Sequence, residues 1–177
     1  MIEHQHSNCF FITFNCRNHF HLLKSDVAKQ MVIDSLLRYS EIYQVSLLGY
    51  VIMPNHVHMI ILFSGRVRLS DFMRDIKKYS SVLIRDFLLL NHPGETFKIN
   101  FIQREQLHKI WQDGYHRKVV FTARFLKQKL NYIHRNPLQE HWKLVEAPEL
   151  YKYSSANYYY ANRQESEIVT HFGDFFR

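Results

Sequence analysis

Two apolar segments separated by only two residues constrain the fold of this chain most strongly. Residues 45–53 and 56–63 each have the length and apolar content of a buried strand. The intervening Pro54-Asn55 is typical of a tight turn, so the two strands are predicted to pair as antiparallel neighbours. Apolar residues occupy both alternating sets of positions in 56–63, which indicates a central strand covered on both faces, with at least one helix over the face that carries the histidines.

The remaining pattern completes an alternating order of strands and helices. A strand is predicted at 9–15, followed by a helix that Asp26 can cap. The later elements are a helix over 69–90, a strand within 107–120, and a helix that begins after Thr122 and reaches Asn136, where Pro137 stops it. The order strand, helix, strand, strand, helix, strand, helix predicts an α+β fold of the ferredoxin-like, split βαβ class, with a central antiparallel sheet flanked by helices.

Length and composition indicate the number of domains and the cellular compartment. At 177 residues the chain is predicted to form one domain over 1–177, with 138–177 as an irregular, tyrosine-rich C-terminal extension packed on it. Cys9 and Cys16 show no metal or disulfide spacing and are interpreted as reduced core residues. No apolar run reaches the roughly 18 residues of a membrane span, and the N-terminus lacks the pattern of a secretory signal. We therefore expect a cytoplasmic protein with no membrane partner.

The charge balance favours a polyanionic partner. The chain carries 23 Lys and Arg against 16 Asp and Glu, a formal charge of +7, with a pI near 9.4. Such a balance suits nucleic acid, although a solvated basic surface without a partner is the alternative for any single residue. The candidates for phosphate contact are Arg74, Lys77, Lys78, Arg117, Lys118 and Arg135.

Two histidines at the start of the predicted strand 56–63 form a candidate metal site. Residues two apart on a strand point to the same face, so His56 and His58 present two imidazoles side by side. Buried structural histidines are the alternative. Two further pairs, His4/His6 and His19/His21, fall outside the predicted strands and have no regular backbone to hold them.

A tyrosine and an amide on the last predicted helix add to this pair. Tyr132 and Asn136 are four apart and therefore share a helix face, whereas His134 is predicted to face away from Tyr132. The Asn136 amide oxygen could serve as a third metal ligand beside the two imidazoles, leaving positions for a phosphate oxygen and water. Mg²⁺ prefers oxygen ligands, while Mn²⁺ accepts mixed nitrogen and oxygen sites.

These residues lie in motifs that resemble the HUH single-tyrosine transposases, and within them the REP-associated tyrosine transposases. The matching segments are Gly-Tyr-Val-Ile-Met-Pro-Asn-His-Val-His (49–58), Tyr-Ile-His-Arg-Asn-Pro (132–137) and Pro-Glu-Leu-Tyr-Lys-Tyr-Ser-Ser-Ala (148–156). Lys77-Lys78-Tyr79-Ser80 and Trp111-Gln112-Asp113-Gly114-Tyr115 are also similar to this group. The resemblance spans roughly residues 8 to 160.

The resemblance implies a DNA-nicking and joining enzyme acting in transposition. It implies that His56, His58 and Asn136 hold a divalent metal, Mg²⁺ or Mn²⁺, and that Tyr132 is the nucleophile that forms a 5′-phosphotyrosine. Single-stranded or hairpin DNA is the implied partner, and a monomer or a homodimer is expected. One departure concerns the turn after Asn-Pro, where the group often has a basic residue and a glycine but this chain has Leu138-Gln139-Glu140-His141-Trp142-Lys143.

Two other functions stay open from the sequence. A catalytically silent relative would bind DNA or RNA hairpins without cutting them. A metal-dependent hydrolase would use water as the nucleophile and leave no covalent protein–DNA adduct.

Overall fold

A computed structural model describes residues 8–65, 68–91, 110–161 and 166–176. The strands are β1 (Cys9–Asn15), β2 (Val45–Ile52), β3 (His56–Phe63) and β4 (His116–Val119), and the helices are α1 (Asp26–Tyr43), α2 (Leu69–Asn91), α4 (Ala123–His134) and α5 (Ala156–Tyr160). Short 3₁₀ turns occupy Arg17–His19, Asn136–Leu138, Pro148–Leu150 and Phe172–Asp174. The histidine pair at 4 and 6 lies outside the described residues, as does the part of the predicted fourth-strand segment before residue 110.

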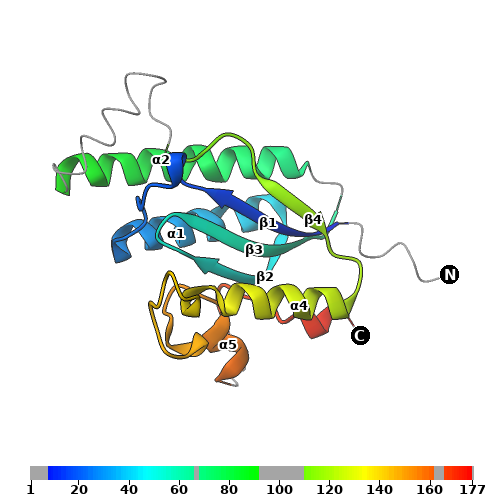
Figure 1. Cartoon of the computed structure of the whole chain (residues 1–177). Coiled ribbons are helices and arrows are strands. Elements are labelled where there is room, and N and C mark those ends of the chain that lie inside the picture. The colour runs from blue at the N-terminus through cyan, green and yellow to red at the C-terminus, as the bar shows by residue number, and fades with distance from the viewer. Residues whose placement is uncertain (1–7, 66–67, 92–109, 162–165, 177) are drawn as a thin grey trace.

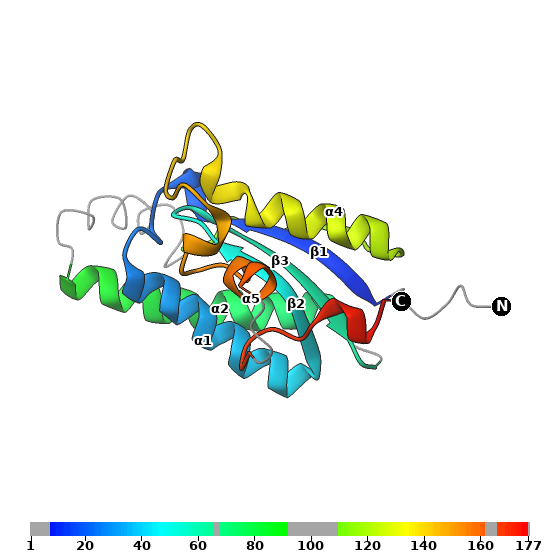
Figure 2. The ribbon, with the colours of Figure 1, turned by 90° about the horizontal axis from the view of Figure 1, so that it is seen from below.

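The four strands form one antiparallel sheet in the order β2-β3-β1-β4. This order confirms the predicted ferredoxin-like arrangement, because the two central strands are the first and third in the chain. Helices α1 and α2 cover one face of the sheet, while α4 and the C-terminal segment cover the other (Figures 1 and 2). The central strand β3 is therefore covered on both faces, as its apolar pattern predicts.

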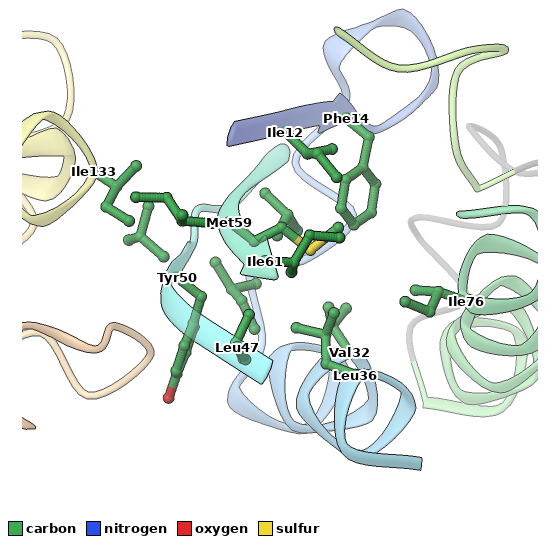
Figure 3. Close-up of a cluster of buried hydrophobic side chains, with 14 of the residues drawn as sticks. Ile12, Phe14, Val32, Leu36, Leu47, Tyr50, Met59, Ile61, Ile76 and Ile133 are labelled. Carbon is green, nitrogen blue, oxygen red and sulfur yellow. The ribbon is translucent and has the colours of Figure 1, made fainter. Parts of the chain in front are cut away.

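The larger part of the core lies between the sheet and the α1–α2 layer. Ile12 and Ile61 point from β1 and β3 toward Leu36 of α1 and Ile76 of α2, while Ile133 packs from α4 on the opposite face (Figure 3). All five of these side chains are buried. The sheet is thus a rigid central layer, and any side chain that points out of it has a fixed position.

Three predicted boundaries need correction. The N-cap of α1 is Ser25, whose hydroxyl accepts a hydrogen bond from the Ala28 N–H, whereas Asp26 is the first helical residue. Helix α4 begins after the predicted Thr122 cap but ends at His134, and Asn136 already belongs to the 3₁₀ turn that Pro137 starts. The fourth strand is short, with only His116–Val119 paired to β1.

Helix α4 approaches the sheet closely above Gly49 of β2. A Cβ atom at this position would collide with the Leu130 side chain and lie 3.3 Å from Ile133 Cδ1 and 3.4 Å from Ser155 Oγ. Glycine is therefore needed here for space rather than for backbone conformation. Since Leu130 and Tyr132 belong to the same helix, the contact at Gly49 sets the height of Tyr132 above the sheet.

The C-terminal segment follows the outer edge of β2 and holds the end of α4. The Ile52 N–H donates to the Tyr153 carbonyl, and the Ser155 N–H donates to the Tyr50 carbonyl, both at 2.9 Å. The Ser155 hydroxyl accepts a hydrogen bond from the Tyr50 N–H at 2.9 Å and lies 2.8 Å from His134 Nε2. One buried hydroxyl thus joins the sheet, the C-terminal segment and α4.

Tyrosines of this segment bond to the sheet through their hydroxyls. Tyr151 donates to the Ile52 carbonyl at 2.8 Å, and Tyr159 donates to the Leu48 carbonyl at 2.7 Å. These tyrosines therefore cap an exposed strand edge, which would otherwise offer unpaired backbone groups.

Gly49→Ala is predicted to destabilise the protein by about 1–3 kcal/mol, the usual cost of overpacking a filled core. Chemical denaturation monitored by circular dichroism measures the change. Gly65→Ala is the matched control, because a Cβ there meets nothing within 4 Å among the described residues. The control should cost nothing or stabilise by up to about 1 kcal/mol, through a less flexible unfolded chain. Equal effects of the two substitutions would contradict the packing argument.

Candidate active site

The two histidines of β3 project from the sheet face that α4 covers. Their ring centroids lie 4.7 Å apart. His58 is opposite Thr13 of β1 in the antiparallel register, and His56 is opposite Asn15. Because both neighbours of this part of β3 are hydrogen-bonded strands, the two rings are presented by the most rigid part of the fold.

Hydrogen bonds to one nitrogen of each ring fix its orientation. Thr13 Oγ1 lies 2.7 Å from His58 Nδ1, and Asn55 Oδ1 lies 2.6 Å from His56 Nδ1. His58 Nε2 is buried and has no hydrogen-bond partner within the described structure. A hydrogen bond at Nδ1 orients a metal-ligating histidine and leaves Nε2 available to the metal.

Burial keeps both imidazoles in the neutral form. It lowers the pKa of His56 to about 4, and the neighbouring Asn136 side chain partly offsets this shift. Burial, reinforced by the neighbouring His56, lowers the pKa of His58 to about 3. Neutral imidazole is the form that binds a metal.

Tyr132 and Asn136 lie beside these rings. The Tyr132 ring centroid is 5.2 Å from that of His58, and 42% of the tyrosine is exposed. Asn136 is 2% exposed, and its Oδ1 is buried without a hydrogen-bond partner in the described structure. The structure therefore brings together all four residues that the two sequence motifs contributed, although Asn136 lies beyond the end of α4.

The residues present fit a divalent metal. Two buried polar atoms without partners in the described structure, His58 Nε2 and Asn136 Oδ1, belong to residues that line the same pocket as His56, and an unsatisfied buried polar atom is costly unless a ligand completes it. Among the described residues, no three His, Cys, Asp or Glu side chains are grouped as a metal site. A metal held here would use two imidazoles and one amide oxygen, with the remaining positions open to substrate and water.

The pocket around this site has a volume of about 470 Å³ and includes residues that sequence reasoning did not assign to it. His19 and His21 form part of its wall, so their position outside the strands does not keep them away from the site. The 3₁₀ turn Arg17–His19 and the turn after α4 bring these side chains together. The full lining is Thr13, Asn15, His19, His21, Asn55, His56, His58, Tyr132, Asn136, Gln139, His141 and Trp142.

Comparison with known proteins identifies the family. The sequence pattern of the IS200-like transposases matches residues 5–136, about three quarters of the chain. The chain belongs to the IS200-like transposase family. None of the curated proteins searched gives a significant match.

Two solved structures are similar to this IS200-like transposase. The structure of a REP-associated tyrosine transposase bound to a REP hairpin has a TM-score of 0.68 and 18% identity, over 93% of this chain and 86% of that one. The crystal structure of a suspected transposase from Deinococcus radiodurans has a TM-score of 0.48 and 16% identity, over 72% and 88% of the two chains. The first match confirms the predicted fold at low sequence identity.

The basic candidates of this transposase divide between the two faces of the sheet. Arg74, Lys77 and Lys78 lie on α2 and line a groove of about 490 Å³ that shares no residue with the tyrosine pocket. Arg74 pairs with Asp71 at 2.7 Å and with Asp75 at 2.8 Å. Lys77 donates to the carbonyls of Gln112 and Gly114 at 2.7 and 2.6 Å, so it connects α2 to the loop before β4.

The other candidates lie on β4 and directly after α4. Lys118 is opposite Phe11 in the sheet, and paired residues share a face, so Lys118 points to the α4 side while the adjacent Arg117 points to the α2 side. Arg135 is exposed directly after α4.

Sequence reasoning missed Lys129, whose Nζ lies 4.9 Å from the Phe11 ring and 5.6 Å from the Tyr132 ring. Burial and Lys118 lower the pKa of this ammonium. The sequence signal that could have indicated Lys129 is the local charge, because residues 114–139 contain six Lys or Arg and no acidic residue. We define Lys118, Lys129 and Arg135 as the α4 cationic surface.

One residue of the turn after Asn136-Pro137 adopts a backbone conformation that favours glycine. Lys143 has φ of 44°, in the left-handed region that glycine adopts readily. Its N–H donates to the Gln139 carbonyl at 2.9 Å, which closes the turn. The departure from the family pattern therefore changes the side chains that the turn carries, while the chain still reverses direction there.

None of the described helices has the length and hydropathy to cross a membrane.

Acid is predicted to destabilise the attachment of α4 through His134. Burial lowers the pKa of His134 to about 4, below the value of about 6.5 for a free histidine. The unfolded chain therefore binds a proton first, so the stabilising contribution is complete above about pH 6.5 and is lost as the pH falls toward 4. Within this window His134 should contribute up to about 1.4 kcal/mol per pH unit to the slope of stability against pH.

Urea denaturation at several pH values, in the presence of a chelator, measures this slope. His134→Gln should make it shallower, whereas Asn131→Gln, an exposed and non-titrating change on the same helix, should leave it unaltered. An unchanged slope in His134→Gln would show that His134 is protonated equally in the folded and unfolded states.

Proposed function

We propose that this IS200-like transposase is a metal-dependent endonuclease and strand transferase that acts on single-stranded DNA through Tyr132. The observation that carries the proposal is the convergence of two buried polar atoms without partners in the described structure, His58 Nε2 and Asn136 Oδ1, beside a half-exposed tyrosine. Buried polar atoms are usually hydrogen-bonded, so two of them on neighbouring potential metal ligands favour a bound ion.

Each of the four residues has a separate task in this proposal. His56, His58 and Asn136 would hold Mg²⁺ or Mn²⁺. When bound, such an ion polarises a phosphate oxygen and orients the phosphate. Tyr132 projects from α4 above the same pocket, and its exposure allows a DNA strand to reach the hydroxyl.

The reaction that fits this arrangement is transesterification. The Tyr132 oxygen attacks the phosphorus and loses its proton, the bond from phosphorus to the 3′ oxygen breaks, and that oxygen leaves as a 3′-OH. The product is a 5′-phosphotyrosine, which keeps the phosphodiester energy, so a second 3′-OH can reverse the step and join a new strand. The reaction therefore needs no nucleotide cofactor.

We also propose hairpin-containing DNA as the substrate. The similar solved structure is a transposase bound to a REP hairpin, and this chain shares its fold over 93% of its length. The α4 cationic surface beside Tyr132 offers phosphate contacts, because none of its members is paired with an acidic residue within the described part of the chain. A cytoplasmic location and a monomer or homodimer stay predictions.

The nucleophile is tested by trapping a covalent adduct. The protein is incubated with labelled hairpin oligonucleotides that carry randomised single-stranded flanks, with Mn²⁺ or with a chelator. The wild type should yield a denaturant-resistant protein–DNA adduct only with metal. Tyr132→Phe should lose the adduct completely and keep hairpin binding, because only the hydroxyl is removed.

The alternatives give different outcomes in this assay. Cleavage without an adduct would indicate a hydrolase that uses water. Binding without cleavage under all metal conditions would indicate a silent hairpin-binding protein. An adduct of normal yield in Tyr132→Phe would place the nucleophile elsewhere.

The path of the DNA is tested by the salt dependence of binding. Each phosphate contact contributes about 0.7–0.9 to the slope of log affinity against log salt. Lys118→Ala with Lys129→Ala should therefore lower this slope by about 1.4–1.8. Arg74→Ala is the control, since its guanidinium is already paired with two aspartates, and it should leave the slope unchanged. The reverse result would put the phosphates on the α2 side.

A further inference from the structure

The turn after α4 brings an indole into the candidate active site. Trp142 is half-buried and lines the tyrosine pocket, with its ring centroid 6.0 Å from that of His56. Two exposed histidines flank it, His21 at 5.3 Å and His141 at 5.4 Å. The indole thus lies next to a proposed metal ligand.

No described aromatic ring stacks in parallel on the face of Trp142. All three neighbouring rings are tilted against it, by 41°, 47° and 48°. A tryptophan used only for packing is usually buried against apolar side chains, as Trp111 is, with 2% exposure and its Nε1–H donated to Ser80. Trp142 also packs against the edge of the core, but it is half-buried and lies in a pocket whose other lining side chains are mostly histidine or amide.

The charge of the pocket selects the kind of occupant. No acidic side chain belongs to the lining that the structure describes. A polyanionic strand can therefore enter without repulsion. If a phosphate lies at His56 and His58, the base next to it on the same strand falls within the pocket, and an aromatic ring is the protein group on which unpaired bases stack.

We propose that Trp142 is a stacking platform for an unpaired nucleobase adjacent to the phosphate that Tyr132 attacks. His21 and His141 form the sides of this base subsite. The inference rests on the proposed function, since the position of the phosphate comes from it. The subsite would hold the strand by a contact that is independent of base identity, because every base has a π face.

Binding to oligothymidine, measured by fluorescence anisotropy in the presence of a chelator, tests the platform. Trp142→Leu keeps an apolar side chain but removes the aromatic ring. It should weaken binding by about fivefold or more, corresponding to the 1–3 kcal/mol of one stacked base. Trp142→Phe keeps a ring and should bind much more tightly than Trp142→Leu. Tyr160→Ala, which removes an exposed aromatic ring outside the pocket, should bind like the wild type.

An abasic strand of equal length separates base stacking from phosphate contact. Wild type and Trp142→Leu should bind this strand equally, because it offers charge but no base. Circular dichroism and melting temperature establish that Trp142→Leu is folded. Equal loss of affinity for the normal and the abasic strand would overturn the proposal and make Trp142 a packing residue of the turn.

Intrinsic fluorescence gives a second readout. The chain has two tryptophans, and Trp111 is buried on the other side of the sheet. Oligothymidine should therefore quench the fluorescence of the wild type, whereas Trp142→Phe should show no quenching. Persistent quenching in Trp142→Phe would overturn the proposal.

The two proposals fail in different ways. If the wild type forms no covalent adduct on any hairpin but base-dependent binding still requires Trp142, the proposed chemistry fails and the base subsite stands. If the adduct forms and Trp142→Leu binds both strands like the wild type, the subsite fails and the chemistry stands.

Discussion

The packing of α4 against the β2–β3 half of the sheet is the constraint on which the candidate site depends. The sheet supplies the two histidines, but Tyr132 and Asn136 come from a helix and a turn more than 70 residues later in the chain. Their position is set by the absence of a side chain at Gly49 and by the Ser155 hydroxyl that joins Tyr50 to His134. A displacement of α4 would separate the tyrosine from the histidines without altering either motif.

Charge separates the two faces of the molecule. Helix α2 carries four basic and three acidic residues, and its best-placed cations already have partners within the protein. Residues 114–139, which include β4 and α4, contain six basic residues and no acidic one, and Lys118 and Lys129 among them lie on the same side of the sheet as Tyr132. The number of basic residues alone does not show which segment is available to contact DNA. The availability depends on whether each cation is already paired within the protein.

The site is also more aromatic than its two motifs indicate. Phe11 and Tyr132 surround the Lys129 ammonium, and Trp142 lies among histidines at the opposite side of the pocket. Such contacts combine cationic and aromatic side chains, which are the two kinds of side chain that bind single-stranded nucleic acid. The turn at 138–143, which departs from the family pattern, is the part of the chain that contributes the indole.

The order of the elements, the α+β class and the four residues of the candidate site could be predicted from the sequence alone. Strand alternation places His56 and His58 on one face, and helical spacing relates Tyr132 to Asn136; both are local regularities of the backbone. The other residues around the site are set by tertiary packing. His19, His21 and Trp142 line the pocket because separate segments meet there. Lys129 lies over the Tyr132 ring, and Lys77 donates to carbonyls 35 and 37 residues away. Such contacts depend on how helices and turns pack on the sheet, and packing between distant segments leaves no periodic signal in the chain.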